Sequence, residues 1–148
     1  MNRTGDDAAP TVAVGDGPAF ERLGPTACWD LLHERDFGRI CFSVEEVTHV
    51  LLTGYVVEDH TVYFRSSAFG PVARQVETRP VTLQIDDMQA HHQAGWSATF
   101  TGSAHRVQDA PTMASLWRPV RPTAWGHGIE TLWIALDPDD VRGQRVRA

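Results

Sequence analysis

Alternation of apolar and polar positions predicts a pair of neighbouring strands in the middle of the chain. Residues 49–57 and 61–65 are rich in β-branched and aromatic side chains, and only the short polar run 58–60 separates them. Two such runs joined by a short polar link are typical of a β-hairpin. We expect this hairpin to be the best-defined part of the fold.

Four more segments have the composition or the alternation of strands, and three have the composition of short helices. The expected strands are residues 38–44, 81–86, 95–107 and 131–136, the third of them bent at Gly102. The expected helices are residues 27–36, with Thr26 as N-cap, 72–77 and 111–117. Residues 87–94 and 137–143 are predicted to be polar connections or turns. Six strands with mostly short antiparallel links and a few short helices predict a mainly β protein, a small antiparallel barrel.

Composition divides the chain into a tail and one domain. Residues 1–20 are rich in glycine, aspartate, alanine and proline and have little to bury, so we expect a flexible N-terminal tail. Residues 21–148 suit a single globular domain, and the 42% of hydrophobic residues in the chain can form its core.

Charge and residue usage exclude several classes of function. The formal net charge is −6 and the basic residues are dispersed, which argues against a nucleic-acid partner. All 13 basic residues are arginine, so a Schiff-base mechanism on lysine is excluded. No apolar run reaches the ~20 residues of a membrane span, and no signal-peptide pattern begins the chain. We therefore expect a cytoplasmic protein without a membrane partner, with Cys28 and Cys41 reduced.

The end of the second hairpin strand has the residue types of an anion site. Arg65, Ser66 and Ser67 come at the strand end, and the turn at Gly70 leads into the helix 72–77. Guanidinium, hydroxyl and free helix N–H groups favour a negative charge, so a phosphate could bind there. The alternative is that the two serines only cap the turn and that Arg65 is solvated.

Several short motifs follow one another in a characteristic order. They are Cys28–Leu32 with Phe37–Ile40, Tyr55–Val57 with Val62–Ser66, Ile85–Asp87, Gly95–Ser97 with Gly102, and Asp137–Gly143. In this order and spacing they resemble the pyridoxamine 5'-phosphate oxidase-like family, the flavin-binding split β-barrels, and in particular its small actinobacterial members. The resemblance covers about residues 23–146. It implies a six-stranded antiparallel split β-barrel that forms a homodimer, with two equivalent sites at the interface for FMN or a related deazaflavin.

The resemblance also implies where the cofactor contacts fall: on the first hairpin strand, on the expected anion site, on the helix that follows it and on the longest strand. The implied cofactor-binding residues are Val50, Leu51, Leu52, Thr53, Arg65, Ser66, Ser67, Gly70, Arg74, Trp96 and Ser97. The implied function is that of a flavin-dependent oxidoreductase acting on an unidentified small molecule. No catalytic residue is assigned.

Two departures from the family pattern support an alternative. Leu52-Thr53-Gly54 stands where members have Pro-Val-Asn, and Pro71-Val72 stands where a basic residue is expected after the glycine of the phosphate turn. Loss of a cationic partner for a buried phosphate would cost about 1.5–3 kcal/mol unless Arg65 or Arg74 replaces it. The alternative function is a degenerate, non-catalytic barrel that binds a small planar ligand or haem.

The histidines are candidate metal or haem ligands. His91 and His92 are adjacent, and adjacent side chains in a strand or loop usually point apart. No cysteine or carboxylate lies at a ligand spacing from them. We therefore expect a polar connector there and no metal site. His49, His105 and His127 have no partner that the sequence identifies, so none is assigned as a general base.

Overall fold

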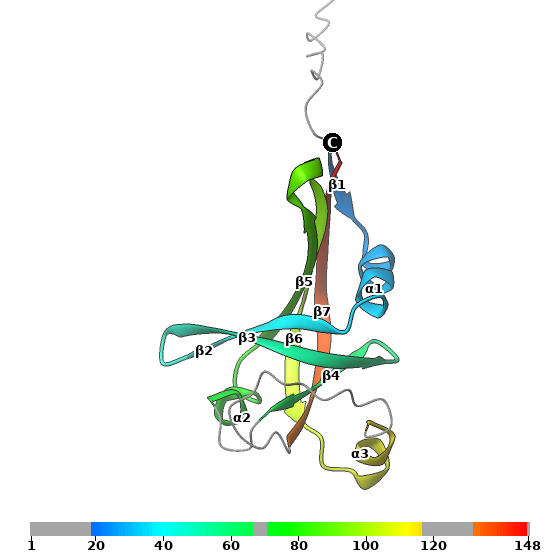
Figure 1. Ribbon diagram of the computed structural model, residues 1–148. Helices are drawn as coiled ribbons and strands as arrows, with labels where there is room; N and C mark the ends of the chain where they lie inside the picture. Colours follow the sequence, from blue (N-terminus) through cyan, green and yellow to red (C-terminus); the bar gives the residue numbers. More distant parts are fainter. Residues whose placement is uncertain (1–18, 67–70, 117–131, 148) are drawn as a thin grey trace, which may run out of the picture.

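Seven strands and three short α-helices make up the described part of the chain (Figure 1). The structure is a computed structural model and describes residues 19–66, 71–116 and 132–147. The strands are β1 (Ala19–Leu23), β2 (Phe37–Val44), β3 (Val47–Glu58), β4 (Thr61–Ser66), β5 (Val81–Gln89), β6 (Ala94–Arg106) and β7 (Leu132–Arg147). The helices are α1 (Pro25–His33), α2 (Pro71–Gln75) and α3 (Ala110–Leu116), with a 3₁₀ turn, η1, at Ala90–His92. The predicted mainly β fold is confirmed, and no helix in the described ranges is long and apolar enough to span a membrane.

All strand pairs are antiparallel, and their order closes a barrel. Neighbours in the sheet follow the order β1-β7-β4-β3-β2-β5-β6, and β6 also pairs with β7. The last pairing joins the six predicted strands into a ring, which is the expected split barrel, and β1 adds a seventh strand along β7. Sequence patterning missed β1 because its residues are exposed along almost the whole strand. It begins at Ala19, so the last two residues of the predicted tail belong to this strand.

The strand β7 is much longer than predicted. The segment 137–143, predicted as a turn from its Asp-Pro-Asp-Asp composition, continues the strand to Arg147. The ladder between β6 and β7 shifts register at Thr101/Gly102, opposite Pro138, so the proline lies at a bulge where a missing N–H is tolerated. A Cβ on Gly102 would lie 2.0 Å from the carbonyl oxygen of Asp137, which explains the glycine at the predicted bend.

Two other boundaries differ from prediction. Residues 87–94, predicted as a polar connector, mostly extend β5 and β6, which pair as far as Gln89 and Ala94 around η1. Helix α1 begins one residue before Thr26, with Gly24 as its N-cap and Pro25 in the first turn. Proline is favoured there because its fixed φ suits the helix and its missing N–H would have no partner.

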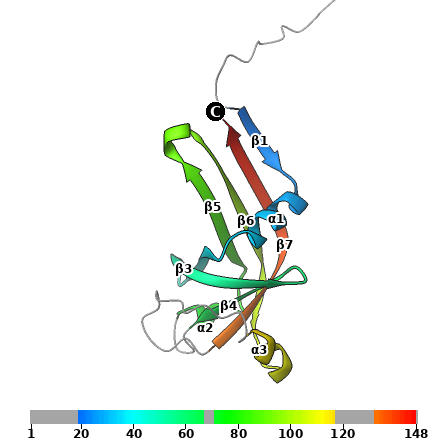
Figure 2. The ribbon, with the colours of Figure 1, turned by 45° about the vertical axis from the view of Figure 1, so that its right-hand side comes forward.

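The main core lies inside the barrel and is extended by one face of α1. Its largest fully buried side chains include Phe64, Phe100, Leu32, Ile40 and Ile134. A second, smaller cluster lies outside the barrel under α3. It consists of Val107, Leu116, Trp133 and Ala135. In Figures 1 and 2 the barrel fills the lower half of the molecule, and β5, β6, β7 and β1 continue upward as an open arm.

The β2–β3 turn gives a first testable prediction. Glu45 and Glu46 connect the strands with φ values of 47° and 66°, a left-handed conformation that strains residues other than glycine or asparagine. Replacing them with Asn-Gly should therefore raise the free energy of unfolding by up to about 1 kcal/mol in urea denaturation. The same exchange at Asp59-His60 should gain less, because the His60 ring contacts Trp29 at 4.8 Å. A lower stability for the first variant would contradict this account.

Candidate functional site

The first half of β3 is a free sheet edge. Residues 47–54 pair with β2, whereas pairing with β4 begins only at Tyr55, so their second edge has no strand partner within the described ranges. The Tyr55 N–H donates to the Asp36 carbonyl on the β2 side at 3.1 Å. Alternate residues of a strand direct their backbone groups to opposite edges, so Val50 and Leu52 direct N–H and C=O groups to the free edge.

This free edge is also apolar on both faces. The side chains of Val50, Leu51 and Leu52 are 55%, 44% and 46% exposed, and successive side chains of a strand point to opposite faces. An exposed, apolar strand edge is a template for association with another molecule. The sequence-predicted residues of β3 therefore lie on a surface suited to a ligand or a partner chain.

Tyr55 fixes the point where β3 and β4 separate. Its hydroxyl donates to the Leu32 carbonyl at 2.7 Å, which ties β3 to the end of α1. Burial raises the pKa of Tyr55, and the neighbouring Asp36 carboxylate acts in the same direction. The tyrosine is therefore a neutral hydrogen-bond donor at neutral pH, and it holds the base of the free edge in place.

Three of the predicted residues lie at the point where the two strands part. Thr53 on β3 and Arg65 and Ser66 on β4 lie just beyond the last pair, Tyr55 with Phe64. Arg65 and Ser66 leave opposite faces of β4. The Arg65 guanidinium lies 5.8 Å from the centre of the Trp133 ring on the outer face, and Ser66 is buried on the core face. The separation point thus has a cation on its outer face and the Ser66 hydroxyl on its core face, next to the free backbone edge.

Helix α2 explains the missing basic residue of the phosphate turn. Val72 is 3% exposed and packs in the main core with Val76, so its position is used for the interior of the barrel. Arg74, on the same short helix, is exposed to solvent. Ser67 and Gly70, which were predicted to complete the anion site, lie outside the described residues.

Trp96 and Ser97 lie elsewhere on the sheet. Ser97 pairs with Gln144 on β7, whereas Arg65 pairs with Trp133, eleven residues earlier on that strand, or on the order of 35 Å of strand length. Trp96 faces the other side of β6, with the Arg35 guanidinium 5.3 Å from its ring centre. Within one chain, the predicted residues therefore form two distant groups, one where β3 and β4 part and one on the arm.

The histidines have surroundings that the sequence did not reveal. The ring of His49 stacks on Phe42 at 5.3 Å, and His105 Nδ1 lies 3.6 Å from the Asp137 carboxylate. His91 and His92 are exposed on η1. Within the described part of the chain, no group of three or more His, Cys, Asp or Glu side chains is arranged to hold a metal ion. His127 lies outside that part.

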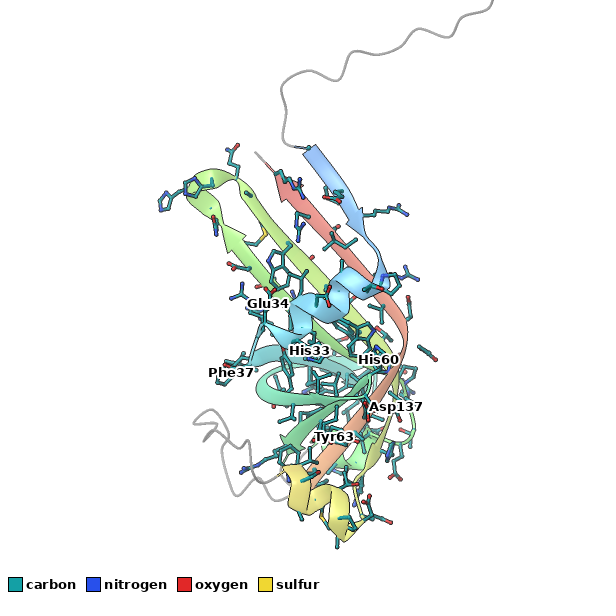
Figure 3. The ribbon with its side chains drawn as sticks, turned by 90° about the vertical axis from the view of Figure 1, so that its right-hand side faces the viewer. His33, Glu34, Phe37, His60, Tyr63 and Asp137 are labelled. Carbon is teal, nitrogen blue, oxygen red and sulfur yellow. The ribbon has the colours of Figure 1, made fainter. Side chains whose placement is uncertain are left out.

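Figure 3 shows further polar side chains on one side of the barrel: His60, which contacts Trp29 of α1, Asp137, and Tyr63, which packs near α3. Thr61 Oγ1 donates to Asp137 Oδ1 at 2.8 Å. Burial raises the pKa of Tyr63, and the carboxylates of Glu58 and Asp137 add to the effect. These negative charges make the cluster unsuitable for a phosphate, unlike the surroundings of Arg65.

The known proteins most informative for this chain share one fold. The family model described as pyridoxamine 5'-phosphate oxidase matches residues 25–145. The FAD binding protein from Mycobacterium smegmatis is 27% identical, with a TM-score of 0.67 over 87% of this chain and 100% of its own. The FAD-binding protein from Mesorhizobium loti is 14% identical, with a TM-score of 0.68 over 89% and 100%. The FAD and haem binding protein from Mycobacterium smegmatis is 15% identical, with a TM-score of 0.63 over 85% of this chain and 73% of its own. No curated protein sequence matches this chain.

Proposed function

Because the chain belongs to the pyridoxamine 5'-phosphate oxidase family, we propose that it binds a flavin nucleotide, FMN or a related deazaflavin, and acts as an oxidoreductase on a small molecule. The free edge of β3 beside Arg65 is the observation that supports this function best. The similarity to an FAD binding protein at 27% identity supports a flavin as the ligand class. A bound flavin would supply hydride or electron transfer.

The donors at the β3–β4 separation fit the polar parts of such a cofactor. A phosphate needs a cation, which Arg65 provides on the outer face at the end of β4, and hydrogen-bond donors, which the free backbone edge of β3 provides beside it. The polar edge of a flavin ring needs backbone donors and acceptors, which the free edge at Val50 and Leu52 provides. In this proposal the apolar side chains of the same edge contact the ring and exclude water.

We further propose that the functional unit is a homodimer. The exposed Val50, Leu51 and Leu52 side chains favour burial against another chain. A second copy would also bring residues of its own arm, such as Ser97, to the separation point, which a single chain cannot do. The site would then consist of residues from both protomers.

The dimer gives a second testable prediction. Leu52→Asp places a charge on the apolar edge, and burying an unpaired carboxylate is strongly unfavourable. We expect sedimentation velocity to show a dimer for the natural protein at micromolar concentration and a monomer for Leu52→Asp. Thr48→Asp, an exposed position on the same face nearer the turn, is the matched control and should affect association less. A monomeric natural protein would contradict the proposed dimer.

A binding protein without catalysis is the second candidate. The buried Val72 favours it, because the position expected to supply a cation for the phosphate holds a core side chain instead. The visible spectrum of the purified protein distinguishes flavin from haem, before and after addition of FMN, FAD or a deazaflavin. Anaerobic reduction with reduced nicotinamide nucleotides, followed by reoxidation with trial acceptors, tests the chemistry. Bound flavin that turns over supports the oxidoreductase, and bound flavin that is never reoxidised by any acceptor supports the binding protein.

A further inference from the structure

Helix α2 is fastened to the end of β6 by two reciprocal hydrogen bonds. The guanidinium of Arg106, the last residue of β6, donates from Nη2 to the Ala73 carbonyl at 2.5 Å. In return, the Glu77 carboxylate just beyond α2 accepts the backbone N–H of Arg106 at 3.3 Å. The guanidinium contact joins residues that are 33 positions apart in the sequence, so no local pattern pointed to it.

These contacts matter because α2 is too short to hold its own position. It has five residues, Pro71–Gln75, and helices of this length are not stable alone. The carbonyls of its last turn have no helical N–H partner. A guanidinium suits such a carbonyl, because the C-terminal end of a helix is negative. Val72 and Val76 therefore fix the apolar side of this segment in the core, and Arg106 fixes its polar side.

The sheet brings Arg106 close to the proposed flavin site. It pairs with Ile134 on β7, and Ile134 pairs with Phe64 on β4, the residue before Arg65. Neighbouring strands lie about 4.8 Å apart, so roughly 10 Å separates the backbones of Arg106 and Phe64. Figures 1 and 2 show α2 beside the end of β4. The helix thus carries its own arginine, Arg74, in the neighbourhood of Arg65.

We propose that Arg106 is a positioning residue of the flavin site, which holds α2 so that Arg74 supplies a second positive charge to the phosphate of the cofactor. The inference rests on the proposed function, because it needs a phosphate bound at Arg65. Val72 fills the position of the expected basic residue with a core side chain, so a second charge has to come from elsewhere on the helix. Arg106 acts through Arg74, because its own guanidinium is bound to the Ala73 carbonyl.

Fluorescence titration of FMN and riboflavin into Arg106→Met tests the positioning role. FMN should bind about three- to tenfold more weakly than to the natural protein, whereas riboflavin, which lacks the phosphate, should bind both proteins alike. Arg106→Lys should restore most of the FMN affinity, because one N–H donor is enough for a carbonyl. Arg79→Met removes an exposed arginine shortly after α2, and as the matched control it should bind FMN like the natural protein.

A double-mutant cycle with Arg74→Gln shows whether the two arginines act together. Arg74→Gln should weaken the binding of FMN but not of riboflavin, and in that background Arg106→Met should cause no further loss. Losses that multiply would overturn the link between the two residues, and equal losses of both ligands in Arg106→Met would assign Arg106 to the fold alone.

Arg74 is exposed, so Arg74→Gln keeps the inference falsifiable even where Arg106→Met fails to fold. Unchanged FMN binding in Arg74→Gln would overturn the inference and leave the proposed function intact. A natural protein that binds neither FMN nor riboflavin would overturn the proposed function, and this inference with it.

Discussion

Replacing Phe100 with alanine is expected to lower the free energy of unfolding by about 3–5 kcal/mol. Phe100 is fully buried at the centre of the main core, and the Trp29 ring of α1 meets it edge-on at 5.0 Å between ring centres. The substitution removes the aromatic contact and leaves a cavity between the helix and the barrel. Because domains of this kind are stable by about 5–15 kcal/mol, the loss should be a large fraction of the total.

Urea denaturation of both proteins, followed by circular dichroism, measures this loss. Phe20→Ala is the matched control, because the same ring is removed from an exposed position on β1 and should change the stability by less than about 1 kcal/mol. A similar loss for both variants would mean that the barrel interior is not the main source of stability. It would also place the core in a different part of the molecule.

Replacing Arg65 with alanine is expected to weaken FMN binding by about 10- to 100-fold, which corresponds to about 1.5–3 kcal/mol for a hydrogen bond to a charged group. Riboflavin, which has no phosphate, should bind both proteins alike. Arg65→Lys should restore FMN binding only in part, because an ammonium cannot make the paired contacts of a guanidinium. Fluorescence titration of both ligands against the three proteins measures these differences.

Arg79→Ala controls for the loss of one positive charge, since Arg79 is exposed and its nearest acidic partner, Glu46, lies at 3.7 Å. It should bind FMN like the natural protein. Equal losses of riboflavin and FMN in Arg65→Ala would show that Arg65 acts through its contact with Trp133 on the fold or the dimer. The assignment of Arg65 to the phosphate would then have to be abandoned.

Local patterns in the sequence were sufficient for the six strands of the ring. The hairpin of β3 and β4 was predicted because β-branched residues flank the short polar link 58–60, and the structure places its turn at Asp59-His60. The end of β7 and all of β1 were not predicted, because these segments form strands by pairing with each other and, for β7, with β6. Pro138 lies at a bulge of the strand, but the residues around it have the same composition as those around a proline in a turn.

The candidate site was predicted in its parts and not in its arrangement. Arg65 and Ser66 were expected at a strand end, and they lie where β3 and β4 part. Ser97 lies far from them because it pairs with Gln144 on β7, whereas Arg65 pairs with Trp133, eleven residues earlier on the same strand. The free edge of β3 likewise depends on where pairing with β4 stops, and residue composition does not encode that point.

Calorimetric titration of FMN, FAD and a deazaflavin into the natural protein, with sedimentation of the same samples, tests the central claim most directly. The proposed function predicts saturable binding of one flavin per chain to a dimeric protein, with a weaker response in Leu52→Asp, whose edge cannot associate. A folded protein that binds none of the three ligands would contradict the assignment of the β3 edge and Arg65 to a flavin site.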